Sequence, residues 1–133
     1  MNWGNYYICL IALTAWREAR GEGVDGMRAV LHVIRNRVMS QRFGDWAMVC
    51  TKKFQFSSMS APNDPELILW PETGDAQFEQ AYQLAVAVFA GTDADNTNGA
   101  TFYFADSIPA PSWAASMRET VKIGHQTFFS SEA

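Results

Sequence analysis

Three stretches of the chain carry apolar residues at helical spacing. Tyr6–Arg20 contains no Gly or Pro, and its apolar residues cover more than one face, which predicts a mostly buried helix that stops at Gly21. Asp25–Met39 has apolar residues three and four positions apart, which predicts a second helix with one apolar stripe. Asp75–Ala90 shows the same periodicity and is followed by Gly91. The helical part of the chain is therefore mainly N-terminal.

The other segments have a different character. Gln41–Trp70 is mixed, and we expect a short helix at Asp45–Cys50 within a long loop region that carries function. Ala100–Phe104 and Thr120–Phe129 are rich in β-branched and aromatic residues, which is typical of strands. Because the predicted helices come first along the chain and the short strands come last, we expect an α+β fold that is mainly helical and has a small C-terminal β element.

Length and composition limit the class of protein. The 133 residues fit a single domain, residues 1–133, and 48% hydrophobic with 14% aromatic residues excludes a disordered chain. The apolar run Tyr6–Trp16 is shorter than the roughly 20 residues that cross a bilayer, and no basic segment precedes it. We therefore expect no stable membrane insertion and see no signal peptide.

Charge and cysteine usage exclude further classes. The net charge of −4 has the wrong sign for a protein that binds nucleic acid through its phosphates, although residues 1–66 alone carry +2. Cys9 and Cys50 lack metal-site spacing and only two histidines are present, so we expect no metal and no cofactor. Cys9 lies in an apolar stretch and is expected to be buried, and whether the two cysteines are bonded stays open.

Arg17–Gly23 is the most unusual segment, because it places two carboxylates and two arginines at the end of an apolar helix. Glu18 faces the negative end of the helix dipole, and burial beside Trp16 would add desolvation; both effects favour the protonated acid. Cleavage of a glycosidic bond needs such an acid, because the leaving oxygen must be protonated. Glu18 is therefore a candidate general acid. From residue types and spacing alone, however, the favoured interpretation is that Glu18 and Glu22 form ion pairs with neighbouring arginines on a solvated helix end.

Four motifs in order resemble those of one enzyme family. Trp16–Val30, continued by Ile34–Val38, resembles the opening signature of the SleB-type cell wall hydrolases, the spore cortex-lytic family. Phe54–Ser57 resembles the Gln-Phe-Ser element of that family, Ala100–Phe104 its Ala-x-x-Tyr-Tyr segment, and Ile123–Phe129 its closing Ile-Gly-x-His-x-Phe strand. The resemblance covers roughly residues 10–129.

One position departs from this pattern. The family histidine comes two residues after Gly124, where this chain has Gln126, and His125 stands one residue earlier. A shift of one residue on a strand turns the side chain to the opposite face, so no role is carried over to His125.

The resemblance implies a lysozyme-like fold and cleavage of the β-1,4 bond between N-acetylmuramic acid and N-acetylglucosamine in peptidoglycan glycan strands. Glu18 matches the catalytic acid of the family. In a lytic transglycosylase this residue also serves as the base that lets the muramyl 6-hydroxyl close a 1,6-anhydro ring, so neither water nor a second carboxylate is needed.

A hydrolytic muramidase is the alternative reaction, and it needs a second carboxylate about 5–9.5 Å away. Glu22 is the nearest in sequence, but Gly21 is expected to break the helix between the two. A cap or an ion pair to Arg28 or Arg20 that shapes the turn is the preferred interpretation of Glu22, with a direct role in the site as the alternative.

Five residues are candidates for substrate binding. Tyr103 can hydrogen-bond either the sugar or Glu18, and Gln55 and Ser57 are neutral polar groups suited to N-acetyl and hydroxyl recognition. Trp113 can stack on a sugar ring, and Glu22 completes the set.

The setting of this activity would be the cell wall, in the periplasm or outside the cell, and we expect a monomer. A phage lysin made in the host cytoplasm and a bacterial wall-remodelling enzyme fit equally well. A non-catalytic wall-binding or virion structural module is the alternative from another class.

Overall fold

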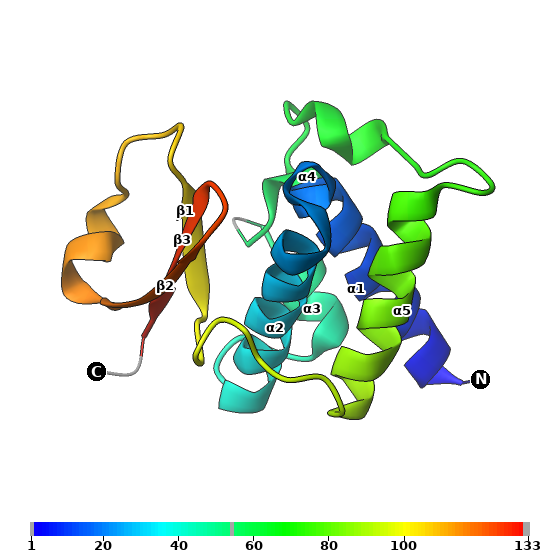
Figure 1. Cartoon of the computed structure of the whole chain (residues 1–133), viewed down its shortest axis with the longest axis horizontal. Helices are drawn as coiled ribbons and strands as arrows, with labels where there is room; N and C mark the ends of the chain where they lie inside the picture. Colours follow the sequence, from blue (N-terminus) through cyan, green and yellow to red (C-terminus); the bar gives the residue numbers. More distant parts are fainter. Residues whose placement is uncertain (1, 54, 132–133) are drawn as a thin grey trace.

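The structure, a computed structural model, describes residues 2–53 and 55–131. Helices α1 (Trp3–Ala19), α2 (Gly23–Ser40) and α5 (Ala76–Ala90) pack against one another, and a small antiparallel sheet lies beside α2 (Figure 1). The expected α+β fold, mainly helical with a C-terminal β element, is confirmed.

The junction between α1 and α2 differs from the expected simple stop at Gly21. After Ala19 the chain makes one 3-10 turn, η1 (Arg20–Glu22), and α2 begins at Gly23. Gly23, not Gly21, has the positive φ, 75°, that reverses the chain direction. One turn later, a Cβ on Gly26 would lie 2.4 Å from the Cβ of Glu22. The two glycines therefore let the ends of α1 and α2 meet at the site where Glu18 emerges.

The other helices begin and end where capping residues predict. The side chain of Asp75 accepts a hydrogen bond from the Phe78 backbone N–H, and Gly91, with φ 78°, ends α5. Asp45 caps α3 (Trp46–Thr51) by accepting from the Met48 N–H. The predicted helix at Asp45–Cys50 is thus present, shifted by one residue.

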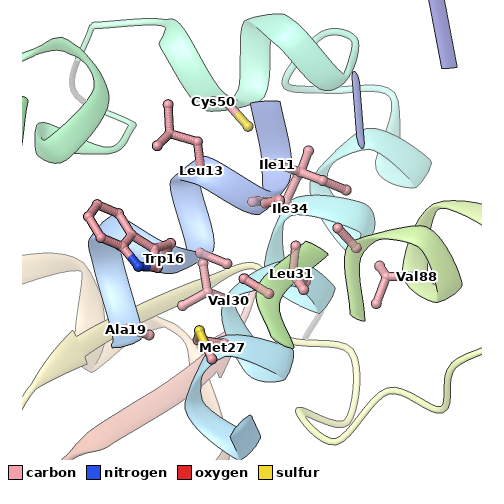
Figure 2. Packing of buried hydrophobic residues seen from close by; sticks show 14 of the residues in the cluster. Ile11, Leu13, Trp16, Ala19, Met27, Val30, Leu31, Ile34, Cys50 and Val88 are labelled. Atoms are coloured by element: carbon pink, nitrogen blue, oxygen red, sulfur yellow. The ribbon is translucent and has the colours of Figure 1, made fainter. Parts of the chain in front are cut away.

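The main core lies between α1, α2, α3 and α5. Ile11, Val30, Leu31 and Val88 are fully buried there, and Figure 2 shows how these side chains converge from neighbouring helices. Cys50 is buried in the same cluster. The expectation for Cys9 was wrong: it is exposed, because it lies on the outer face of the first half of α1, and both cysteines are free.

The sheet contains β1 (Phe102–Ala105), β2 (Arg118–Ile123) and β3 (Gln126–Ser130), paired antiparallel in the order β1-β3-β2. The stretch Thr120–Phe129, predicted as one strand segment, is a hairpin that turns at Gly124 and His125. Gly124 has φ 59°, a conformation that glycine adopts without strain.

A second buried cluster attaches the sheet to the helices. Phe128 of β3 packs there with Ala29 and Val33 of α2 and with Ala100, and Tyr103 borders both this cluster and the main core. The sheet therefore covers the side of α2 that faces away from the main core (Figure 1).

Between α3 and α5, the described residues form two short helical elements, α4 (Ser57–Ser60) and η2 (Pro65–Ile68), and a third, η3 (Ser112–Ser116), lies before β2. The buried guanidinium of Arg17 holds the segment between α3 and α5 onto α1: its Nε donates to the Leu69 carbonyl at 3.0 Å and its Nη1 to the Ser58 carbonyl at 3.2 Å. In residues 2–53 and 55–131, no helix is both long and apolar enough to cross a membrane.

Candidate active site

A cleft of about 820 Å³ opens between the C-terminal end of α1, the segment around α4, and strands β1 and β3. Its walls combine apolar rings with a few polar groups, which is the usual make-up of a saccharide or small-molecule site. The residues that line it are Glu18, Arg37, Lys53, Gln55, Phe56, Ser57, Ser60, Ala61, Pro62, Asn63, Phe102, Tyr103, Phe104, Ala105, Ile108, Pro111, Trp113 and Gln126.

Glu18 reaches the cleft from the last turn of α1, where it is partly buried. The hydroxyl of Tyr103 donates a hydrogen bond to Glu18 Oε1, so the contact predicted between these two residues is confirmed. Among the described residues that line the cleft, Glu18 is the one carboxylate. The arrangement therefore presents a single acid, held by a neutral donor.

Tyr103 is placed by the sheet. It lies in β1 opposite Phe128, and the two ring centroids are 5.3 Å apart at an interplanar angle of 30°. Burial raises the pKa of Tyr103 well above 10.0, and the neighbouring Glu18 raises it further. Its hydroxyl therefore stays protonated at neutral pH and can only act as a donor toward Glu18.

Arg37 is a site residue that sequence reasoning did not single out, although it lies within the Ile34–Val38 motif. The side chain is buried, with Nε donating to the Thr101 carbonyl at 2.6 Å and Nη1 donating to Gln55 Oε1 at 2.9 Å. Burial lowers the pKa of Arg37 to about 10, opposed by Tyr103, Cys50 and Glu18, so it remains a cation at neutral pH.

The bond from Arg37 also sets the orientation of Gln55. Because the carboxamide oxygen of Gln55 accepts from Arg37, its Nε2 is the end that can donate to a molecule in the cleft. Three aromatic rings surround the guanidinium, those of Phe43, Phe56 and Phe102, at 5.3, 5.2 and 4.9 Å. These contacts fix Arg37 and therefore Gln55.

Ser57 and Trp113 also line the cleft. The exposed Ser57 hydroxyl donates to Asp64 Oδ2 at 2.6 Å. The ring of Trp113 packs against Phe102 and Phe129, with centroids 5.2 and 5.4 Å apart. Five residues predicted from the sequence as site residues therefore line the same cleft: Glu18, Gln55, Ser57, Tyr103 and Trp113.

Glu22 is the candidate that the structure does not bring to the cleft. Its Oε1 accepts a hydrogen bond from the backbone N–H of His125, 3.0 Å away, in the turn of the β2–β3 hairpin. The arginines considered as its partners have others: Arg20 pairs with Glu66 at 2.5 Å and Arg28 with Asp93 at 3.2 Å. Glu22 therefore fastens the hairpin to the α1–α2 junction.

The described ranges contain no candidate metal site. No three His, Cys, Asp or Glu side chains gather there in a way that could hold a metal ion. His32 is buried on α2, with Nε2 2.7 Å from Asp93 Oδ2, and Asp93 also forms an ion pair with Arg28, so the three side chains make one polar cluster. This cluster lies outside the cleft.

Comparisons with known structures agree with this fold. The catalytic domain of the germination-specific lytic transglycosylase SleB from Bacillus anthracis has 27% identity and a TM-score of 0.73, over 92% of this chain and 93% of that one. The SleB catalytic domain from Bacillus cereus has 28% identity and a TM-score of 0.74, over 92% and 88%. A comparison with curated proteins gives no match.

A family model supplies the assignment. The model described as Cell Wall Hydrolase matches residues 21–129, a range that includes most cleft-lining residues and begins just after Glu18. The chain therefore belongs to the cell wall hydrolase family.

Proposed function

We propose that the protein is a peptidoglycan-degrading glycosidase that works as a lytic transglycosylase, with Glu18 as its single catalytic acid and base. One observation carries the proposal: of the described residues that line the cleft, Glu18 alone is a carboxylate, and Tyr103 holds it. Hydrolysis by two carboxylates needs a partner across the cleft, and the nearest one in sequence, Glu22, binds the hairpin backbone instead.

The contact with Tyr103 divides the work between the two oxygens of Glu18. Because Oε1 accepts from the Tyr103 hydroxyl, Oε2 is the oxygen that carries the transferred proton. It first gives this proton to the glycosidic oxygen as the bond to the muramyl C1 breaks and its electron pair moves to that oxygen. The carboxylate then takes the proton of the muramyl 6-hydroxyl, whose oxygen bonds to C1 and closes the 1,6-anhydro ring.

Other residues of the cleft bind and orient the glycan strand. Gln55 presents its amide donor, Ser57 offers a hydroxyl at the rim, and Trp113 supplies an apolar wall beside Phe102. Glu22 acts on this site through the hairpin that it fastens, as a positioning residue. The enzyme works as a monomer on cell wall outside the cytoplasmic membrane.

The experiment compares Glu18→Gln with the protein that carries Glu18. Initial rates of muropeptide release from purified sacculi are measured, and we expect a loss of about 10²- to 10⁴-fold, the range attributed to general acid–base catalysis. Glu79→Gln, an exposed carboxylate on α5, is the matched control and retains the rate. A folded Glu18→Gln protein that lyses sacculi at the normal rate would remove Glu18 from the mechanism.

Mass spectrometry of the released fragments tests the reaction type. A lytic transglycosylase leaves 1,6-anhydro ends, which are lighter by one water than the reducing ends made by a muramidase. Reducing ends alone would overturn the proposal of a single-carboxylate mechanism.

A further inference from the structure

Gln126 combines burial with an unmet hydrogen bond inside the cleft. Its side chain is only 7% exposed, it is part of the cleft wall, and its Oε1 has no hydrogen-bond partner among the described residues. Buried amide groups are almost always paired, and leaving an acceptor unmet costs stability. An apolar side chain of the same size would avoid that cost, so the acceptor at this position requires an explanation.

The strand geometry places Gln126 beside the catalytic pair. Gln126 lies in β3 opposite Ala105, and Phe128, two residues later, lies opposite Tyr103. Residues two apart on a strand share a face, and so do residues directly opposite each other. Gln126 is therefore on the sheet face that carries Tyr103, diagonal to it, where Tyr103 reaches Glu18.

The start of β3 is held by contacts that do not involve the side chain of Gln126. The adjacent His125 backbone N–H donates to Glu22 Oε1, which fastens the start of β3 to the α1–α2 junction. β3 is also the central strand, paired on both sides. The position of Gln126 relative to Glu18 therefore follows from backbone contacts, and its carboxamide is not needed to hold the strand.

From these observations we infer that Gln126 is a substrate-binding residue whose Oε1 accepts a hydrogen bond from the saccharide unit bound beside Glu18. The inference rests on the proposed function, because a glycan strand is the molecule that would occupy this cleft. N-acetylated sugars offer two kinds of donor, the acetamido N–H and ring hydroxyls. A site built to pair such a donor also rejects ligands that lack it.

The test measures binding in the Glu18→Gln background, so that the purified sacculi used as the probe stay intact. Gln126→Leu is expected to weaken binding about tenfold in a sedimentation assay, the effect of one neutral hydrogen bond. Its melting temperature should equal or exceed that of the reference, since an unmet buried acceptor is removed. Gln126→Glu keeps acceptor oxygens and should bind like the reference. Gln80→Leu, the same change on the exposed face of α5, is the matched control.

Repeating the binding assay on native and de-N-acetylated sacculi identifies which sugar group donates the hydrogen bond to Gln126. If the loss caused by Gln126→Leu disappears on de-N-acetylated sacculi, the donor is the acetamido N–H; if the loss persists, the donor is a hydroxyl. Either result supports the inference. Equal binding of Gln126→Leu and the reference would overturn it, as would a joint loss of binding and of thermal stability in both Gln126 variants, which would indicate a structural role.

The outcomes for Gln126 and for the proposed function can be told apart. Anhydro products from the Glu18 protein, together with unchanged binding by Gln126→Leu, would overturn the role of Gln126 alone. Weakened binding by Gln126→Leu without any anhydro product would overturn the lytic transglycosylase proposal and leave Gln126 as a glycan contact.

Discussion

Tyr103→Phe isolates the hydroxyl that binds Glu18, the proposed catalytic acid. The ring of Tyr103 packs against Phe128 and borders both buried clusters, and phenylalanine keeps all of that packing. Only the hydrogen bond to Glu18 is lost. A hydrogen bond to a charged group contributes about 1.5–3 kcal/mol, which corresponds to roughly 10- to 150-fold in rate if it is fully used in the transition state.

We therefore expect the initial rate of muropeptide release to fall by at least roughly tenfold in Tyr103→Phe. Thermal stability should change little, because water can reach the partly buried Glu18 carboxylate and replace the lost donor. Tyr6→Phe, an exposed tyrosine at the other end of α1, is the matched control and retains both rate and stability.

The pH dependence separates two roles for the Tyr103 hydroxyl. Burial and Glu18 keep the pKa of Tyr103 well above 10.0, so the hydroxyl stays protonated from about pH 5 to about pH 9. Tyr103 should then add no ionisation of its own to the wild-type pH–rate profile over that range. A basic limb of that profile that is lost in Tyr103→Phe would mean that Tyr103 itself transfers a proton, and a variant with full activity would refute the idea that this contact positions Glu18.

Two further predictions concern the core and the helix junction. Burial raises the pKa of the Cys50 thiol to about 12, so iodoacetamide should label exposed Cys9 alone in the folded protein and both thiols after denaturation, as read by intact mass. Because the folded pKa lies above the ordinary 9.0, the stabilisation from Cys50 is complete below pH 9 and is lost as pH rises toward 12; between these values, urea melts should show that the wild-type protein loses about 1.4 kcal/mol more per pH unit than Cys50→Ala does. Gly26→Ala should cost about 1–3 kcal/mol in the same melts, because its Cβ would meet Glu22 at 2.4 Å, whereas Gly21→Ala meets nothing within 4 Å and should be neutral. An unchanged Gly26→Ala melt would contradict this packing.

The helices could be predicted because their signals are local. Apolar spacing and the caps Asp75 and Gly91 determine α5 without reference to the rest of the chain, and the bounds agree within a residue. The hairpin escaped prediction because its only turn signal, Gly124, lies inside a continuous run of strand-type residues. The exposure of Cys9 depends on which face of α1 the other helices cover, which periodicity does not determine when apolar residues surround the helix.

The site was predictable where residue chemistry was unusual and not where it depended on tertiary contacts. Glu18 and Tyr103 lie in motifs that resemble those of the family, and a contact with Glu18 was one of the two expected for Tyr103, the other being with the sugar. Arg37 looks in sequence like one more surface cation on a helix, and only the aromatic rings and carbonyl around it show why it is buried. A role for Gln126 could be inferred only from the structure, where the residue is part of the cleft wall and its buried Oε1 has no hydrogen-bond partner among the described residues.

The two layers of the fold contribute different parts of the chemistry. The helical layer carries the proposed acid, because Glu18 lies in the last turn of α1. The sheet carries Tyr103, which binds Glu18, and Gln126, the proposed substrate contact. Tyr103 packs against the main core and against the cluster beneath the sheet, so the ring that joins the layers also carries the hydroxyl that binds Glu18. A change that loosened the packing of Phe128 on α2 would therefore move the donor away from the acid, and activity should be lost before the helical core melts.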